Sequence, residues 1–426
     1  MDIGIIGAGL SGLSLAFMLK NKNCRVEIFE ASDKIGGLLR SETLDGYTFD
    51  IGGSHIIFSK DQNVLREIVN VIGAVVEHRR RTFIYYKDKF IKYPFENGIY
   101  MLPKEERFEI LFDFFQNVIK REKGELKKPS NLLEWFYYVF GKAITEKYLK
   151  PYNEKLWKRD LKDISLEWVG NRVPNPPVED VLKSCVGIPT EGYTHQLRFY
   201  YPLKGGIEML IRKLAENLDF PIRTNERIRR IRREDGKVIL EGSNHFEFDL
   251  VISTAPIDVT VKLFKDWKVV KSFVERLDYN SLTVVGLGVR GKTPDFHWVY
   301  VPNKDIVFHR MAFLHNYSPN MCPKNRSNVI LEISRRPDEK PKDVLDEALD
   351  GLARMGFNFD VEVYGIWHWD YAYIVYNHDY KMAVDRLRSF LIERGVIPFG
   401  RFGSWEYLNI DAVWKCAKDL VERLVI

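Results

Sequence analysis

Residues 7–12 read Gly-Ala-Gly-Leu-Ser-Gly, a G-x-G-x-x-G in which each glycine serves a different purpose. Gly7 permits a tight turn, Gly9 lets the backbone approach a pyrophosphate, and Gly12 lets a helix pack closely on a strand. The start of that helix, at Leu10 and Ser11, offers free N–H groups and a positive dipole end to phosphate. The spacing predicts that the chain binds a dinucleotide.

The segments around this turn exclude an ordinary glycine-rich loop. Residues 2–6 read as a buried strand, residues 11–21 as a helix and residues 24–30 as a second strand. Glu30 ends that second strand, 18 positions after Gly12, and its carboxylate can accept hydrogen bonds from a ribose diol. We therefore predict a Rossmann-type βαβ unit.

A second pair of glycines indicates which dinucleotide is bound. Gly36 and Gly37 follow six residues after Glu30, and Arg40 lies just beyond them. Such a pair soon after the ribose acid is typical of FAD proteins rather than NAD dehydrogenases. At such a pair the backbone passes close to the cofactor, and an arginine can meet phosphate. FAD is the predicted cofactor.

The rest of the chain must supply the elements that hold this unit and any substrate site. Residues 103–165 have helical periodicity, with a helix start near Ser130–Glu134, and residues 205–218 form an amphipathic helix. Strand patterns dominate residues 281–375, and a helix runs from about Asp411 to the end. The fold class predicted is α/β, with the dinucleotide-binding strands scattered along the chain and other domains inserted between them.

Composition limits the classes of function. The net charge of +5 is too diffuse to predict nucleic-acid binding, and the four cysteines show neither CxxC nor metal-ligand spacing, so no metal is expected. The sequence has no secretion signal, and no apolar run reaches the length of a membrane span. These features predict a soluble, cytoplasmic protein. The 13% of aromatic residues fits either a large core or a wide apolar ligand site.

Several longer motifs resemble one family. Residues 1–60 resemble the amine-oxidase-like flavoprotein superfamily. The motifs that resemble UDP-galactopyranose mutases, especially the eukaryotic type, follow one another in the family's order and are YPFENGIYMLPKEE (93–106), PYNEKLW (151–157), WVGNRV (168–173), VVGLGVRG (284–291), FHRMAFLHNYSP (308–319) and GRFGSWEY (400–407).

The resemblance implies three domains. The expected FAD-binding Rossmann-like domain is discontinuous and comprises 1–60, 205–265 and 395–426. The expected inserted helical domain is 103–165. The expected antiparallel β-sheet substrate domain comprises 61–102, 166–204 and 266–394.

The resemblance also implies an isomerase that interconverts UDP-galactopyranose and UDP-galactofuranose with no net redox change. In this family N5 of the reduced flavin is the nucleophile at the sugar's anomeric carbon. No catalytic dyad is therefore needed, and the sequence shows none. Arg172 and Arg310 match the family's clamp on the substrate pyrophosphate, to which the planar guanidinium is suited. His55 matches a histidine near the flavin, and a buried core histidine is the alternative.

Further residues match the family's binding positions. Those expected to bind the nucleotide sugar are Tyr93, Phe95, Glu96, Asn153, Trp157, Tyr317, Tyr373 and Tyr407. Those expected to bind FAD, beyond the residues of the first glycine turn, are Glu30, Gly36, Gly37, Leu38, Arg40, Ile228, Arg401, Asn409 and Asp411.

One position departs from the family's pattern. Glu96 stands where the eukaryotic enzymes carry Gln, and an ionised carboxylate only accepts hydrogen bonds, whereas an amide also donates. Glu96 would accept from uracil N3–H but repel O4. The identity of the base, and so of the substrate, stays open.

Two other functions compete with the mutase. One is an FAD-dependent oxidase or dehydrogenase of the amine-oxidase or protoporphyrinogen-oxidase type, which shares the FAD motifs. The other is a flavin- or nucleotide-sugar-binding protein without turnover. The two arginines favour the mutase, because an amine oxidase has no pyrophosphate to hold. The reductant, with NADPH and NADH as candidates, and the oligomeric state, a homo-oligomer included, stay open.

Overall fold

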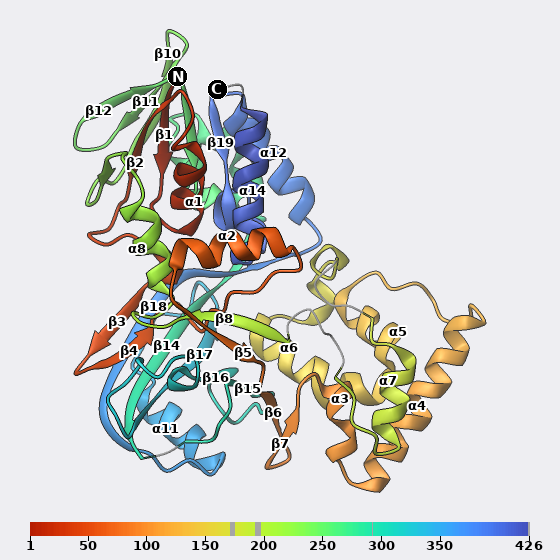
Figure 1. Ribbon diagram of the computed structural model, residues 1–426. Helices are drawn as coiled ribbons and strands as arrows, with labels where there is room; N and C mark the ends of the chain where they lie inside the picture. Colours follow the sequence, from red (N-terminus) through yellow and green to blue (C-terminus); the bar gives the residue numbers. More distant parts are fainter. Residues whose placement is uncertain (171–174, 192–196, 292, 425–426) are drawn as a thin grey trace.

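The computed structural model describes residues 1–426 except 171–174, 192–196, 292 and 425–426. Figure 1 shows three parts: a parallel sheet with helices near both termini, a large sheet below it, and a group of helices to one side. Across the described residues no helix is both long and apolar enough to cross a bilayer.

A five-stranded parallel sheet contains the glycine-rich turn. Its order is β19-β13-β1-β2-β9, and its strands are β1 (Asp2–Ile6), β2 (Arg25–Phe29), β9 (Ile222–Arg223), β13 (Leu250–Ser253) and β19 (Val396–Pro398). The central strand β1 is almost wholly buried, as its run of apolar residues predicts. Strands from both ends of the chain meet here, so the predicted scattering of this unit is confirmed.

Helices cover the parallel sheet, and one small antiparallel sheet packs against it. The helices of this part are α1 (Leu10–Leu19), α8 (Glu208–Glu216), α9 (Ile257–Lys262), α10 (Lys271–Val274), α12 (Tyr380–Ile392), α13 (Gly400–Gly403) and α14 (Ile410–Arg423). The small sheet consists of β10 (Arg230–Glu234), β11 (Lys237–Glu241) and β12 (His245–Phe248). Helix α1 packs against α14, which begins at residue 410, close to the expected start.

The second large sheet has seven strands in the order β18-β14-β17-β16-β15-β6-β7. Its strands are β6 (Thr82–Tyr86), β7 (Lys89–Lys92), β14 (Asp278–Arg290), β15 (Trp298–Tyr300), β16 (Arg310–Phe313), β17 (Arg326–Arg335) and β18 (Asp360–Val375), with α11 (Leu345–Arg354) between the last two. All its strand pairs are antiparallel except β6 and β15, which run parallel. The hairpin of β3 (Ser41–Leu44) and β4 (Tyr47–Asp50) lies against it, because a Cβ at Gly286 or Gly288 would meet Phe49 or Tyr47.

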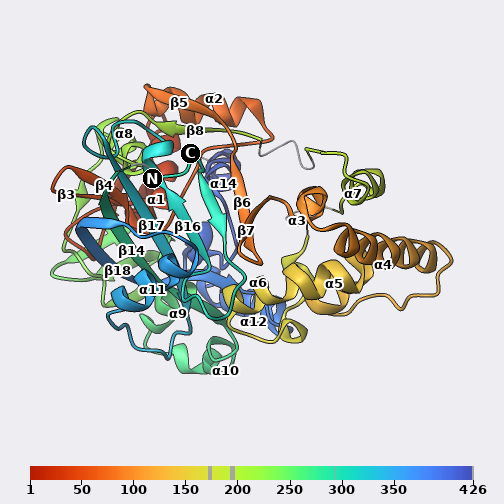
Figure 2. The ribbon, with the colours of Figure 1, turned by 90° about the horizontal axis from the view of Figure 1, so that it is seen from below.

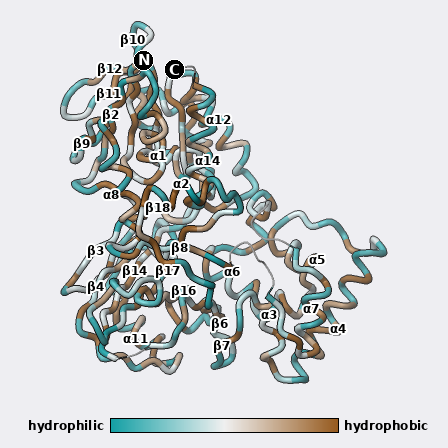
Figure 3. Tube along the Cα trace, in the orientation of Figure 1, coloured by the Kyte–Doolittle hydropathy of each residue, from teal (hydrophilic) through white to brown (hydrophobic). Residues whose placement is uncertain are grey.

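The helical part projects beside this sheet (Figure 2). It contains α3 (Phe95–Gly98), α4 (Lys104–Glu122), α5 (Leu132–Ile144), a π-helical turn (Thr145–Leu149), α6 (Lys150–Trp157) and α7 (Val178–Cys185). The start predicted near Ser130 is confirmed with one refinement, because Asn131 caps α5 while Ser130 donates to Glu134. In Figure 3 the tube of α4 alternates between hydrophilic and hydrophobic residues.

Two segments differ from the expected division into domains. Helix α2 (Gln62–Ile72) lies within 61–102, yet it contacts α8 and α14 beside the parallel sheet. Residues 166–204 are rich in Pro, Gly and Tyr, which predicts loops, but they contain helix α7, which contacts α3 and α4. The same stretch contains β8 (Arg198–Pro202), which pairs with β5 (Val75–Arg79). We therefore propose that α2 belongs with the cofactor domain and α7 with the helical domain, because packing overrides position in the sequence.

Candidate active site

A cavity bounded by the described residues has a volume of about 1230 Å³. It runs from the turn after β1 to the face of the seven-stranded sheet and the end of α6. Most drug-sized ligand sites are smaller, at roughly 300–1,000 Å³. This cavity has room for a dinucleotide together with a second ligand.

The glycine-rich turn forms one end of the cavity. A Cβ at Gly12 would lie 2.0 Å from the Gly7 carbonyl oxygen, so Gly12 holds α1 against the turn rather than facing the cavity. A Cβ at Gly9 would meet nothing closer than Gly36 O at 3.9 Å. Gly7, Gly9, Leu10, Ser11, Gly36, Gly37 and Leu38 all line the cavity. The open space at Gly9 leaves room for a pyrophosphate, and the contact of Gly9 with that group stays a prediction.

Glu30, the residue predicted to bind the ribose, lines the cavity beside the glycine-rich turn. Its carboxylate accepts hydrogen bonds from Ala8 N at 2.9 Å and Ser32 N at 3.0 Å, and its side chain lines the cavity. Ile228 lines the same end, and so does Glu226, which sequence reasoning missed. Both oxygens of Glu226 accept hydrogen bonds from Ser243, an arrangement that joins the small sheet to the cavity wall.

A second helix N-terminus faces the cavity. Asn409 is the N-cap of α14 and makes no side-chain cap, and Asn409 and Asp411 both line the cavity. Arg401 lines it too, but its Nη1 and Nη2 donate to the carbonyls of Leu408 and Ala372 at 3.1 and 2.8 Å. Its guanidinium carbon lies 4.0 Å from the centre of the Tyr407 ring. In this arrangement Arg401 braces the wall of the cavity.

Arg310 is the arginine at the opposite end of the cavity. Its Nε and Nη2 donate to Oε1 and Oε2 of Glu332 at 2.8 and 2.5 Å. Glu332 is fully buried, and although burial raises its pKa, the charge and hydrogen bonds of Arg310 bring that pKa below the usual value. The carboxylate also accepts from Ser54 N at 2.9 Å and from the Tyr373 hydroxyl at 3.3 Å. Glu332 thus joins the arginine to the 52–55 loop.

His55 lies on that loop, half-buried in the cavity wall. Its Nδ1 is 2.9 Å from the Gly53 carbonyl oxygen, which only accepts, so Nδ1 carries the proton and Nε2 is an acceptor. Burial lowers the pKa of His55, Glu332 opposes that shift and Arg310 adds to it, so that the pKa is about 4. A ligand in the cavity therefore meets a neutral imidazole.

Three tyrosines complete this end of the cavity. Tyr317, Tyr373 and Tyr407 line it, and the rings of Tyr373 and Tyr407 are nearly parallel, with centroids 6.5 Å apart. The Tyr317 hydroxyl is buried near Ser54, but it has no partner in hydrogen-bonding geometry among the described residues. Trp157 packs edge-on against both Tyr373 and Tyr407. These aromatic side chains therefore form part of the wall of the cavity that Arg310 also lines.

Comparison with known proteins identifies the family. The model of the flavin-containing amine oxidoreductase family matches residues 10–378. The chain belongs to this family. Membership implies FAD as the cofactor, and the open space before Gly9, the Glu30 carboxylate and the α14 N-terminus fit that group.

Individual relatives are more distant. The chain is 28% identical over 39% of its length to coproporphyrinogen III oxidase of Staphylococcus aureus, and 25% identical over 71% to polyamine oxidase 4 of Oryza sativa subsp. japonica. These alignments span 38% and 60% of the two relatives. A crystal structure of reduced UDP-galactopyranose mutase superposes with a TM-score of 0.90, covering 99% of this chain and 93% of that chain at 23% identity. That likeness shows the fold.

Within the family fold, several predicted residues lie outside the cavity lining. The Phe95 ring stacks on Tyr148, 5.2 Å between centroids, in the core of the helical part. Asn153 donates to Leu149 O and accepts from Trp157 Nε1 along α6. Glu96 is buried in the first turn of α3, and the Arg40 side chain lies over the Trp369 ring. Because local packing already uses these side chains, their predicted contacts with a ligand stay predictions.

Arg172, the second predicted clamp, falls outside the described residues. Tyr93 does line the cavity, and its ring packs 4.7 Å from that of Tyr300. Tyr300 and Trp298 line the cavity from β15 and were missed, as was Glu332. The strand patterns at 298–300 and 326–335 marked these segments, but nothing in either pattern indicated which side chains face a ligand.

Proposed function

We propose that this flavoprotein is a reduced-FAD-dependent isomerase that interconverts UDP-galactopyranose and UDP-galactofuranose. The supporting observation is that Arg310, Tyr317, Tyr373 and Tyr407 line the same cavity as the dinucleotide turn. Such a group suits a sugar-linked diphosphate, whose charge a guanidinium binds and whose oxygens accept from tyrosine hydroxyls.

The ion pair with Glu332 orients the arginine for this task. Glu332 takes the Nε hydrogen and one Nη2 hydrogen, so both hydrogens of Nη1 and the second hydrogen of Nη2 are left for an anionic ligand. Through Ser54 N the same carboxylate fixes the loop that carries His55. We propose that His55 offers its Nε2 lone pair to the flavin. The reduced flavin would supply the nucleophilic nitrogen for attack at the anomeric carbon.

The walls of the cavity account for the remaining requirements. Trp157, Trp168, Trp298 and Tyr300 line it with apolar surface, which excludes water from a reaction in which the sugar bond to UDP is broken. Tyr93 and Tyr300 form an aromatic site for the base. Glu96 is buried near Tyr93. Burial raises the pKa of Tyr93 most, and Tyr300 and then the charge of Glu96 raise it further.

Turnover by reduced and oxidised protein tests this function. We expect dithionite-reduced holoprotein to convert UDP-galactofuranose to UDP-galactopyranose, and oxidised protein not to do so, as followed by chromatography of the nucleotide sugars. Arg310→Lys should retain FAD but lose most of this activity, because the ammonium lacks the two-pronged geometry that holds both Glu332 and an anion. Arg354→Ala, in an exposed pair on α11, is the control. Full activity of Arg310→Lys would remove Arg310 from the site.

An oxidase is the second candidate. The observation that favours it is the Glu332 carboxylate, which neutralises Arg310 and so weakens the attraction for a diphosphate. The relatives named as oxidases point the same way. In that case the oxidised protein should release hydrogen peroxide with coproporphyrinogen III or a polyamine, and reduced protein should leave UDP-galactofuranose unchanged.

A further inference from the structure

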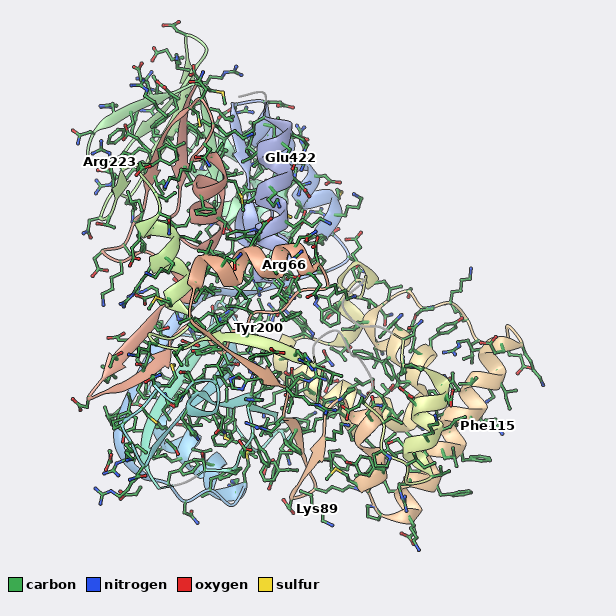
Figure 4. All side chains as sticks on the ribbon, in the orientation of Figure 1. Arg66, Lys89, Phe115, Tyr200, Arg223 and Glu422 are labelled. Atoms are coloured by element: carbon green, nitrogen blue, oxygen red, sulfur yellow. The ribbon has the colours of Figure 1, made fainter. Side chains whose placement is uncertain are left out.

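A fully buried carboxylate lies directly behind the arginine that borders the ligand space. Both oxygens of Glu332 pair with Arg310, and no part of the Glu332 side chain reaches solvent. Charged side chains such as Lys89 and Arg223, by contrast, are exposed at the edges of the molecule (Figure 4). Because water does not screen Glu332, its charge depends on the groups packed around it and on any ligand bound beside it.

Several elements contribute titratable groups to the surroundings of this ion pair. Among the described residues, the titratable side chains around the pair and its nearest neighbours are Asp50, His55, Tyr152, Lys155, Lys158, Tyr300, His309, Tyr317, Tyr373, Arg401 and Tyr407. Burial raises the pKa values of Tyr152, Tyr317 and Tyr373, so these three hydroxyls keep their protons at neutral pH.

The basic and acidic neighbours do not replace Arg310 as the partner of Glu332. The pKa is about 4 for His55 and about 3 for His309, with burial as the largest cause, so both rings are neutral. Burial also brings the pKa of Lys155 to about 7 and that of Asp50 to about 6. Their hydrogen bonds go elsewhere, from Lys155 to carbonyl oxygens and to Asp50 from the Tyr201 hydroxyl.

An anion bound by Arg310 disfavours the ionised form of Glu332. Such an anion uses the hydrogens that Glu332 leaves free on the same guanidinium, which places it about 6 Å from the carboxylate. At an effective dielectric constant of about 20, each unit of negative charge there raises the proton affinity of the carboxylate roughly a hundredfold. A sugar-linked diphosphate has about two such charges, and like charges beside a buried carboxyl favour its protonated form.

The wall of the cavity can hold a proton on Glu332 without leaving its O–H unpaired. The Tyr373 hydroxyl donates to Glu332 Oε2 at 3.3 Å and lies 3.4 Å from Nε2 of His309. A protonated carboxyl would donate to the tyrosine oxygen, and the tyrosine hydroxyl would then turn to His309. Nδ1 of His309 has no hydrogen-bond partner among the described residues, so either ring nitrogen can carry the imidazole proton. The hydrogen bonds therefore close in both protonation states.

We propose that binding of a sugar-linked diphosphate at Arg310 is accompanied by the uptake of one proton, and that Glu332 holds this proton. The inference rests on the proposed function, because it takes a nucleotide sugar as the ligand. Protonation removes the charge that neutralises Arg310, so the guanidinium keeps its full charge for the diphosphate. His55 does not compete for the proton, because in the proposed function its Nε2 is a hydrogen-bond acceptor.

Isothermal titration calorimetry of the oxidised holoprotein with UDP-galactopyranose measures the proton. Oxidised protein avoids turnover, and the diphosphate diester of this ligand does not itself titrate near neutral pH. Titrations at about pH 6.5 in two buffers of different ionisation enthalpy should show uptake of close to one proton per ligand. The Kd should accordingly rise at least about fivefold between pH 6 and pH 8. Binding without proton uptake would overturn the proposal.

Variants assign the proton to one residue. Glu332→Gln should bind UDP-galactopyranose with no net proton uptake and with a Kd that does not change over the same pH range. Asp350→Asn, which removes one partner of an exposed ion pair on α11, is the control and should take up the proton as wild type does. His55→Gln should also keep the uptake. Uptake that persists in Glu332→Gln would overturn the proposal, and its loss in His55→Gln would assign the proton to the imidazole instead.

Infrared difference spectroscopy of the wild-type holoprotein gives a readout that does not depend on how well a variant folds. Addition of UDP-galactopyranose should produce the carbonyl band of a protonated carboxylic acid and remove a carboxylate band. The new band should persist in Asp50→Asn, and its absence from wild type would reject the proposal. Ligand binding without the band or the proton uptake rejects this inference alone, whereas no binding of UDP-galactopyranose at any pH rejects the proposed function with it.

Discussion

Arg310 and Glu332 face each other across neighbouring strands and form a two-pronged ion pair in the wall of the cavity. They lie directly opposite in the register of β16 and β17, and their nitrogens and oxygens meet at 2.8 and 2.5 Å. Glu332 is fully buried, and the Arg310 side chain is 23% exposed. One end of the pair is therefore sealed in the sheet while the other borders the ligand space.

The pair predicts an asymmetric effect of mutation on stability. Arg310→Ala leaves a buried carboxylate without its counter-charge, and we expect the free energy of unfolding to fall by about 3–5 kcal/mol. Arg310→Ala combined with Glu332→Gln should recover a large part of that loss, because no buried charge remains. Urea unfolding of the two variants and of Glu332→Gln measures the coupling. Additive losses would show that the two residues act independently.

The two glycines of the phosphate turn predict separable defects. Gly12→Ala puts a methyl group 2.0 Å from Gly7 O, so we expect the apoprotein to lose about 1–3 kcal/mol of stability. Gly9→Ala places its methyl group in open space at an ordinary φ of −80°, so the apoprotein should keep its stability. The same methyl group occupies the pyrophosphate position and should weaken FAD binding about tenfold or more. Thermal unfolding and flavin titration distinguish them, and normal FAD binding by Gly9→Ala would place the pyrophosphate elsewhere.

Tyr317 and Tyr201 predict a contrast between two buried hydroxyls. The Tyr201 hydroxyl donates to Asp50 Oδ2 at 2.6 Å, so Tyr201→Phe should cost about 1.5–3 kcal/mol. The Tyr317 hydroxyl finds no such partner within the described residues, so Tyr317→Phe should leave the apoprotein as stable as wild type or slightly more so. Its mutase activity should nevertheless fall if the hydroxyl binds the diphosphate. An equal loss of stability in both variants would contradict this contrast.

His55 predicts a pH dependence of stability. Its pKa is about 4 in the fold and 6.5 as the ordinary value, so the unfolded chain takes up the proton first as the pH falls. The free energy of unfolding should therefore decrease between pH 6.5 and pH 4, by at most about 3 kcal/mol at 1.36 kcal/mol per pH unit. His55→Gln lacks this titration, so its advantage over wild type should grow across that window. Parallel denaturation curves of the two proteins against pH would show that His55 stays accessible to water.

The phosphate turn could be predicted because its constraints are local. Gly7 adopts a positive φ of 99° and Gly12 packs against the Gly7 carbonyl, and both requirements are set within a few residues. The strands and helix around them follow from apolar periodicity. The helix in 166–204 was missed because tertiary contacts with α3 and α4 stabilise α7, whereas the Pro- and Gly-rich composition around it reads as loop. Its position along the chain placed α2 in the antiparallel-sheet substrate domain, but its apolar face packs beside α14, next to the parallel sheet.

The sequence alone predicted the dinucleotide-binding unit, the strand-rich segment 281–375 of the large sheet, and Arg310, His55 and the tyrosines as candidate site residues. Only the tertiary structure decided that Glu332 holds Arg310 and that Asn153 and Phe95 contact neighbouring residues of the helical part. It also decided that Phe108, Phe112 and Phe115 of α4 are exposed to solvent. The reason is that side-chain partners 22 residues apart, as in Arg310 and Glu332, are chosen by strand register. Register depends on the whole sheet, whereas a glycine turn depends on its immediate neighbours.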